Sequence, residues 1–550
     1  MSTFQHTPPF GGAFARRFTR YSGLFFDEFA TDSAWIRETA VLRLPPMADV
    51  GAVVLRGEFR THPDARGPER GFPTLEVFLD GTSVATVSSP GPGPWEARIA
   101  LKTDSALKGS VIYLVLHGVG FTNALAWLGR VTRFGPLQRF RAQNRNRQLR
   151  MLAIESGAGE RIYDFSKRES PYSTAFARSH SRTGMNVVGF LTADLGIGES
   201  ARCMVRAADA ASIPMALVPL RLNCRNRLGD LTYENRLQDL NPYGANVFHI
   251  DPPVARDIDH HHGIEFRKNK YNIGYFAWEL PEFPDAWMPS LDYFDEIWCP
   301  SNFVRDSIAL KALFPVLTMA HSIGFKRPDA GNAALRAQFG LPADRFLFLT
   351  LFDLNSYTAR KNPRAVIEAF RKSGVAGGKA SLVIKVQNAD SNPSDFAALN
   401  EAIRDLPGTL VISATLARSD VYALEAACDC FVSLHRSEGF GLAVAECMYL
   451  GKPVIATDWS ATAEYLDRGN GYPVRYALAE LTENHGPYAK GASWAEADTG
   501  HASELMQKIV SEPDEAALIG AAAARTIEER FSPAVIGARY RRRLEAIACL

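Results

Sequence analysis

A pattern of apolar strand, glycine-containing turn and helix recurs through residues 184–548 and constrains the fold more than any other feature. One series begins with "MNVVGFLTADLGIGESARC" and continues through "NVFHI" and "YNIGYFAW". A second begins with "RFLFLTLFD" and continues through "SLVIKVQ" and "KPVIATD". Alternating strands and helices favour a parallel sheet covered by helices. The sequence therefore predicts an α/β fold with two Rossmann-like domains facing a cleft, the usual place for a ligand.

The N-terminal part follows a different pattern. Residues 24–135 contain short alternating strands, with Asp80-Gly81 as a hairpin turn and little helical periodicity. We therefore expect an antiparallel β-sandwich before the α/β part. The predicted boundaries are 1–145 for the sandwich, 146–182 for a linker, 183–320 for the first Rossmann-like domain and 321–532 for the second.

Charge and cysteine content exclude several classes of protein. The chain carries 61 Lys and Arg against 60 Asp and Glu, a formal net charge of +1, so we expect no nucleic-acid partner. Seven scattered cysteines without a Cys-x-x-Cys pair argue against a disulfide framework and favour a cytoplasmic protein. We find no signal-peptide pattern and no apolar run approaching the roughly 18 residues of a membrane span.

The segment "SLHRSEGFGLAVAECMYLGKPVIATD", residues 433–458, places two glutamates around a glycine turn between a predicted strand and a predicted helix. Such a turn lies at the carboxyl edge of the sheet, where its glycines and the helix N-terminus suit phosphate oxygens. Carboxylates instead accept hydrogen bonds from sugar hydroxyls. Glu438 and Glu446 therefore indicate a ligand with both groups, and a capping glutamate beside a buried helix is the alternative.

This Glu-x7-Glu spacing, enclosing "GFGLAVA" and followed by "GKPVIATD", resembles the donor-site signature of retaining glycosyltransferases of family four. The resemblance covers about residues 184–548 and implies the GT-B architecture, with a C-terminal helix over 533–548 that completes the first domain. It implies retaining transfer of a hexose from a nucleotide-sugar donor to a saccharide or lipid-linked acceptor. Bacterial surface polysaccharide biosynthesis is the expected setting, and neither a cofactor nor a metal is expected.

The resemblance also implies roles for individual residues. Glu438 would contact the donor sugar and Glu446 the ribose, while Lys361 would neutralise the diphosphate. The family usually places an arginine near Asn355 or Ser356; here either Arg360 substitutes for it or hydroxyl and backbone donors serve instead. Glu279 occupies a place where the family usually has a histidine. The catalytic candidates are Glu438, Lys361 and Glu279; the other donor-binding candidates are Gly196, Gly198, Ser356, Arg360, Thr415, Leu416, Gly439, Phe440, Gly441, Leu442 and Glu446; the acceptor-side candidates are Trp278 and His249.

Purely structural interpretations of the same residues stay open. Arg360 and Lys361 could be a solvated pair, Glu279 a helix cap, and the glycines at 196 and 198 a purely structural turn. Asp257-x-Asp259, followed by three histidines, resembles a metal-binding DxD, but consecutive histidines do not readily converge on one ion. The arginines of "RFRAQNRNRQLR" could contact the inner membrane face or a lipid-linked acceptor, although a solvated linker is favoured.

Two rival functions also stay open. A sugar-nucleotide epimerase or a phosphorylase could use the same two-domain architecture, the phosphorylase with a pyridoxal phosphate lysine. Alternatively, the sandwich binds carbohydrate and the GT-B core is an inactive scaffold, which exposed tryptophans among Trp35, Trp95 and Trp127 would favour. The sequence does not determine the donor sugar, the nucleotide base, the acceptor, the linkage or the oligomeric state.

Overall fold

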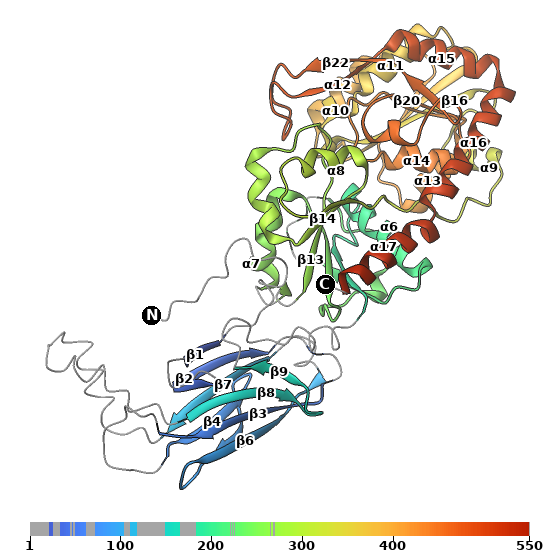
Figure 1. Cartoon of the computed structure of the whole chain (residues 1–550). Coiled ribbons are helices and arrows are strands. Elements are labelled where there is room, and N and C mark those ends of the chain that lie inside the picture. The colour runs from blue at the N-terminus through green and yellow to red at the C-terminus, as the bar shows by residue number, and fades with distance from the viewer. Residues whose placement is uncertain are drawn as a thin grey trace.

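A computed structural model gives the arrangement of the chain (Figure 1). An antiparallel β part at the N-terminal end, drawn in blue, is set apart from a larger α/β part. The structure describes residues 21–25, 33–44, 47, 50–61, 72–103, 110–117, 149–165, 183–220, 222, 224, 226–263, 266–267 and 270–548.

The N-terminal strands form one antiparallel sheet in the order β5-β4-β7-β2-β8-β3-β6, with β1 paired to β2 and β9 to β8. The sheet curls until its edge strands β5 and β6 touch, so its apolar inner faces share one core, as expected for a sandwich. Asp80 and Gly81 both have positive φ and make the predicted turn between β4 and β5. The strands are β1 Tyr21–Phe25, β2 Ala34–Leu44, β3 Ala52–Phe59, β4 Thr74–Leu79, β5 Thr82–Val87, β6 Gly93–Ala100, β7 Ser110–His117, β8 Leu149–Ser156 and β9 Arg161–Asp164.

The linker prediction was wrong for residues 149–164. They form β8 and β9, and β8 lies inside the sheet, where it pairs with both β2 and β3. The strand β8 directly follows the arginine-rich run of the predicted linker, so the sequence pattern did not separate the two. The arginines before residue 149 lie outside the described residues.

The first α/β domain is a parallel sheet in the order β11-β10-β12-β13-β14-β15. Nearly all its central strand residues are buried, because helices cover both faces. His249, at the end of β12, pairs with Tyr275, at the end of β13, so the polar loops after these strands meet at one edge. The elements are β10 Met185–Gly189, α6 Gly196–Ala210, β11 Met215–Pro219, η2 Glu234–Arg236, β12 Ala245–His249, η3 Pro252–Asp257, α7 Ile258–His262, β13 Tyr271–Tyr275, η5 Asp285–Tyr293, β14 Glu296–Cys299, α8 Asn302–Ala309 and β15 Val316–Thr318.

The second α/β domain repeats this plan with a parallel sheet in the order β18-β17-β16-β19-β20-β21. A separate hairpin, β22 and β23, follows this sheet. The elements are α9 Asn332–Gln338, β16 Phe346–Asp353, η6 Leu354–Ser356, α10 Thr358–Lys361, α11 Pro363–Lys372, β17 Ala380–Gln387, α12 Pro393–Ile403, β18 Thr409–Ile412, α13 Arg418–Ala427, β19 Cys430–Ser433, α14 Leu442–Tyr449, β20 Val454–Thr457, η7 Ser460–Glu464, β21 Tyr472–Val474, β22 Tyr476–Glu480, β23 Ser493–Ala497, α15 Thr499–Ser511, α16 Pro513–Phe531 and α17 Pro533–Ala548.

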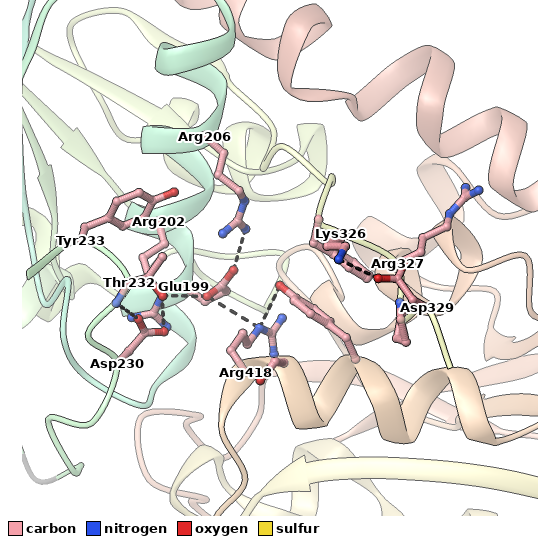
Figure 2. Close-up of a pocket in the computed structure, with 14 residues that line it drawn as sticks. Glu199, Arg202, Arg206, Asp230, Thr232, Tyr233, Lys326, Arg327, Asp329 and Arg418 are labelled. Atoms are coloured by element: carbon pink, nitrogen blue, oxygen red, sulfur yellow. Dashed lines mark hydrogen bonds and ion pairs between the residues drawn. The ribbon is translucent and has the colours of Figure 1, made fainter. Parts of the chain in front are cut away.

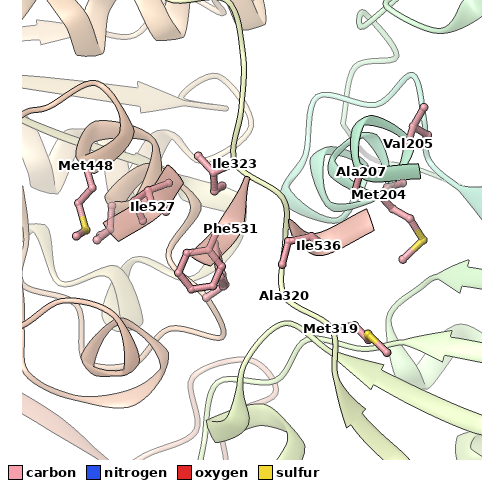
Figure 3. Close-up of a cluster of buried hydrophobic side chains, with 14 of the residues drawn as sticks. Met204, Val205, Ala207, Met319, Ala320, Ile323, Met448, Ile527, Phe531 and Ile536 are labelled. Atoms are coloured by element: carbon pink, nitrogen blue, oxygen red, sulfur yellow. The ribbon is translucent and has the colours of Figure 1, made fainter. Parts of the chain in front are cut away.

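The last helix returns to the first domain. α17 packs against α6, and Tyr540 stacks on Trp298 of β14 with ring centroids 5.3 Å apart. Figure 3 shows the apolar cluster at this crossing, with side chains from both domains around Phe531 and Ile536. Two chain crossings therefore join the domains, the segment before α9 and the turn between α16 and α17.

The α6–α17 contact depends on Gly537. A Cβ on this residue would lie 2.1 Å from the carbonyl oxygen of Ala207, so Gly537→Ala must push the helices apart. We expect the free energy of unfolding to fall by about 1–3 kcal/mol in urea denaturation. Gly378→Ala is the control, because a Cβ there meets nothing within 4 Å. Equal stability of the two variants would contradict the close approach.

Candidate functional site

The glycine turn lies where the sequence placed it, between β19 and α14. Gly441 precedes the helix with φ of +85°, and a Cβ there would lie 2.7 Å from Cγ2 of Thr462. The hydroxyl of Tyr465 donates to the carbonyl oxygens of Phe440, at 2.7 Å, and Gly441, at 3.1 Å. These contacts fix the turn at the N-terminus of α14, where the first amides of a helix have no partner within it and can donate to an anion.

Glu438 lies in this turn between two cations. Its Oε1 accepts a hydrogen bond from Nζ of Lys361 at 2.5 Å and lies 3.2 Å from Nη1 of Arg360. Burial raises the pKa of Glu438, but Lys361 and Arg360 outweigh it and bring the pKa down to about 2. The side chain is therefore a carboxylate at neutral pH.

The two cations come from α10, which follows directly after β16 and η6. Arg360 is buried and donates from Nη1 to the carbonyl oxygen of Ser437 at 2.9 Å. Burial lowers the pKa of Lys361, the pairing with Glu438 opposes this, and the positive charge of Arg360 lowers it further. About a fifth of the Lys361 side chain, 22%, is exposed, so its ammonium group can exchange partners.

Glu279, from the first domain, lies beside Arg360 and the glycine turn of the second domain. It follows β13, and its backbone oxygen accepts a hydrogen bond from the Ser437 hydroxyl. Its Oε1 lies 3.8 Å from Nη2 of Arg360, and its Oε2 accepts a hydrogen bond from the hydroxyl of Tyr488 at 2.9 Å. The three catalytic candidates therefore converge, and Arg360 and Tyr488 join them.

Glu446 belongs to a second cluster. It accepts a hydrogen bond from Nη2 of Arg418, whose Nε lies 3.7 Å from Oε2 of Glu199 on α6. Glu199 also pairs with Arg202 at 2.8 Å and Arg206 at 2.6 Å (Figure 2). Burial raises the pKa of Glu446, and Arg418 opposes this.

A neighbouring carboxylate, Glu425, is also buried, and both burial and the charge of Glu446 raise its pKa. The two carboxyl groups therefore oppose each other's ionisation. A cavity of about 460 Å³ lies beside this cluster, between α6, α13 and residues 325–329 (Figure 2). The cluster thus crosses the boundary between the two domains.

The remaining donor-binding candidates differ in how much space and solvent surround them. Gly198 is structural, because a Cβ would lie 2.6 Å from the carbonyl oxygen of Phe190, whereas a Cβ on Gly196 would meet nothing. Ser356 ends η6 one turn before Arg360. Thr415 and Leu416 lie in the loop between β18 and α13, with Thr415 exposed and Leu416 partly buried.

The two acceptor-side candidates are both buried in the structure. His249 is fully buried; its Nδ1 lies 2.9 Å from the Ser200 hydroxyl, and its ring stacks on Tyr275. Trp278 is 2% exposed, donates to the carbonyl oxygen of Glu282 and packs against Trp287. Their strand-end positions suggested access, but α6 covers one ring and η5 the other.

Tyr488, Arg418 and Glu199 were not singled out from the sequence. Glu199 stands inside the quoted motif "GIGESAR", beside the glycines that were selected. Arg418 opens a helix directly after the loop with Thr415 and Leu416, which is the signal that could have found it. No sequence signal places Tyr488 beside Glu279, because 209 residues separate them.

Other expectations concern metals, membranes and carbohydrate platforms. Within the described residues, no group of three His, Cys, Asp or Glu side chains is arranged to hold a metal ion, and Asp259 pairs with Arg267. No described helix combines the length and apolar character of a membrane span. Trp35 and Trp95 are buried and offer no exposed platform, and Trp127 lies outside the described residues.

Part of the sequence, including the glycine turn, matches a known protein family. Residues 333–505 match the model of the family "Glycosyl transferases group 1". The alpha-monoglucosyldiacylglycerol synthase of Streptococcus pneumoniae is 28% identical over 169 residues, which are 30% of this chain. The match spans only 37% of that relative's length.

Solved structures resemble the α/β part. The Anabaena Alr3699/HepE structure in complex with UDP-glucose aligns with a TM-score of 0.50 at 13% identity, over 66% of this chain and all of its own. Sucrose-phosphate synthase from Thermosynechococcus elongatus aligns with a TM-score of 0.50 at 12% identity, over 66% of this chain and 99% of its own. The α/β part therefore has the GT-B fold.

Removal of Arg418 tests the cluster that crosses the domains. Arg418→Ala leaves the buried carboxylates of Glu199 and Glu446 short of a cation, so we expect the free energy of unfolding to fall by about 3–5 kcal/mol in urea denaturation. Arg404→Ala is the control at an exposed position, with an expected change within about 0.5 kcal/mol. A loss no larger than that of the control would contradict the cluster.

The lowered pKa of Glu438 predicts a pH dependence. Ionised Glu438 stabilises the fold above its ordinary pKa of 4.5, and this contribution is lost as the pH falls toward the folded-state pKa of about 2. Glu438→Gln should therefore be less stable than the wild type at neutral pH, with a difference that shrinks below about pH 4.5. Urea denaturation at several pH values measures it. A difference independent of pH would contradict the pairing.

Proposed function

We propose that this protein is a retaining glycosyltransferase that moves a hexose from a nucleotide-sugar donor to a hydroxyl of a saccharide or lipid-linked saccharide. The observation that carries the proposal is the convergence of Glu438, Lys361 and Arg360 beside the N-terminus of α14. All of these residues lie inside the region that matches the glycosyl transferase group 1 model. The UDP-glucose bound by a protein of the same fold supports a nucleotide sugar as the donor.

The two clusters suit the two ends of such a donor. In the structure, Glu438 is paired with Lys361. A diphosphate would take over Lys361 and the amides of Gly441 and Leu442, and the hydroxyls of the sugar would take over Glu438. Glu446, in the second cluster, would accept from the ribose hydroxyls, with the base toward Thr415 and Leu416. Gly439 and Phe440 complete the turn against the sugar.

The reaction then needs positioning more than a protein nucleophile. The bond between the anomeric carbon and the phosphate oxygen breaks, and its electron pair leaves with the diphosphate. The acceptor oxygen forms the new bond on the same face, and its proton passes to the departing phosphate oxygen. Lys361, Arg360 and the α14 amides stabilise the charge on the leaving group. Before transfer, Glu279 accepts a hydrogen bond from the acceptor hydroxyl and orients it, and the same proton then passes to the departing phosphate oxygen as the new bond forms. We propose no metal for this step.

The closed cleft would keep water from the donor. The hydroxyl of Ser301 donates to the carbonyl oxygen of Gly439 at 2.8 Å. The carboxylate of Glu464 accepts from the first two amides of α8, those of Asn302 at 3.0 Å and Phe303 at 2.7 Å. These contacts join the domains beside the glycine turn, so donor entry requires that they separate.

We assign the enzyme to bacterial surface polysaccharide or glycolipid synthesis at the cytoplasmic membrane face. The relative named as a glucosyldiacylglycerol synthase supports a lipid-linked acceptor. The N-terminal sheet would then serve acceptor binding or assembly. No contact within the described residues favours the epimerase, phosphorylase or inactive-scaffold alternatives.

A donor screen tests the proposal. Purified protein is incubated with UDP-, GDP- and ADP-linked hexoses together with a panel of saccharide and glycolipid acceptors, and release of the nucleoside diphosphate is measured. We expect release from at least one donor, and a loss of at least about 100-fold in Glu438→Ala, because the carboxylate holds both the sugar and Lys361. Glu504→Ala, at an exposed position on α15, is the control. No release from any donor, or full activity of Glu438→Ala, would refute the proposal.

A further inference from the structure

The hairpin of β22 and β23 spans the two domains. It is inserted between β21 and α15 of the second domain, and its strands join neither six-stranded sheet. Three buried side chains of the hairpin and its connecting loop belong to the apolar cluster of the first domain, around Trp278 and Phe283. These three are Leu481, Tyr488 and Trp494.

The base of the hairpin is fixed to the second domain. Arg436, just after β19, pairs with Glu496 and places its guanidinium 4.9 Å from the ring centre of Trp494. The backbone amide of Ala495 donates to the carbonyl oxygen of Arg436 at 3.0 Å. These contacts, together with the chain connections to β21 and α15, make the hairpin part of the second domain.

The tip of the hairpin is pressed against the loop that precedes Arg360 and Lys361. A Cβ on Gly486 would lie 1.9 Å from Cε1 of Tyr357, which leaves space only for glycine. Tyr357 itself has φ of +63°, a conformation that costs a bulky residue about 1–3 kcal/mol. Such strain persists only where surrounding contacts impose it, and it is common at active sites.

Tyr488 ends a chain of polar contacts that runs through the site. Its hydroxyl donates to Oε2 of Glu279, whose Oε1 faces Arg360, which in turn faces Glu438. Its ring packs against Trp278 at 5.5 Å and Tyr357 at 5.6 Å between centroids. The hydroxyl therefore has one position, and the oxygen of Glu279 that it binds is fixed with it.

We propose that Tyr488 is a positioning residue that orients Glu279 toward the acceptor hydroxyl. Because the hairpin belongs to the second domain and Glu279 to the first, the bond forms only when the cleft is closed. Closure of the cleft then brings Glu279, which orients the acceptor, and the donor-binding residues into place at the same time. This inference rests on the proposed glycosyl transfer.

A double-mutant cycle on the full chain tests it. Tyr488→Phe, Glu279→Gln and the double variant are compared for nucleoside diphosphate release with the best donor of the UDP-, GDP- and ADP-hexose panel and a saturating concentration of the best acceptor. Tyr488→Phe keeps the ring and its packing, and should lower kcat about 10-fold with the donor KM within about twofold. In the Glu279→Gln background, Tyr488→Phe should lower kcat by less than about twofold, because the carboxylate that Tyr488 orients is no longer present.

Tyr476→Phe is the matched control, since Tyr476 lies on the same hairpin but is 37% exposed. Its activity should equal that of the wild type. An undiminished effect of Tyr488→Phe in the Glu279→Gln background would overturn the positioning role, as would an unchanged kcat. A wild-type protein that releases no nucleoside diphosphate would instead refute the glycosyl transfer on which this inference rests.

Discussion

Buried charge at the boundary between the two α/β domains is the constraint on which the rest of the site depends. A charged group taken out of water is stable only with a partner, and losing that partner costs more than the pair contributes. Glu438 finds its cations within the second domain, whereas Glu199 and Glu446 share Arg418 across the boundary. The closed arrangement thus keeps each of these carboxylates paired.

The same constraint explains how the site can exchange its partners. Lys361 and Glu438 compensate each other in the structure, and a ligand that brings both an anion and hydroxyl groups offers each of them a substitute. A ligand with phosphate alone would leave Glu438 with only one of its two cations, Arg360. The pairing therefore selects for a molecule with both groups, and a nucleotide sugar is such a molecule. Glu446 lies in a separate cluster and would bind the ribose of the nucleotide sugar.

Local patterns carried enough information to predict the architecture. Buried strands, glycine turns and helices in alternation indicated two parallel sheets, and the Asp80-Gly81 turn and the helix start after Gly441 follow from backbone preferences of glycine and aspartate. The sequence also brought forward Glu438, through its glycine turn at the end of a predicted strand. Lys361, Arg360 and Glu279 came from the resemblance to glycosyltransferase family four.

What the sequence did not reveal depends on contacts between distant segments. β8 belongs to the sheet because it pairs with β2 and β3, and no local sequence signal predicts that pairing. His249 stands at a strand end like the other candidates, but α6 covers it. Tyr488 reaches Glu279 only through the hairpin that spans both domains. In each case tertiary packing decides which side chains are available.

The most direct test of the account is a crystal structure of the protein with the nucleoside diphosphate of its preferred donor. We predict the diphosphate against the first amides of α14 and Nζ of Lys361, with the ribose hydroxyls on Glu446 and the carboxylate of Glu438 released from Lys361. A nucleotide bound away from this edge, or one that leaves the Lys361–Glu438 pair intact, would contradict the account.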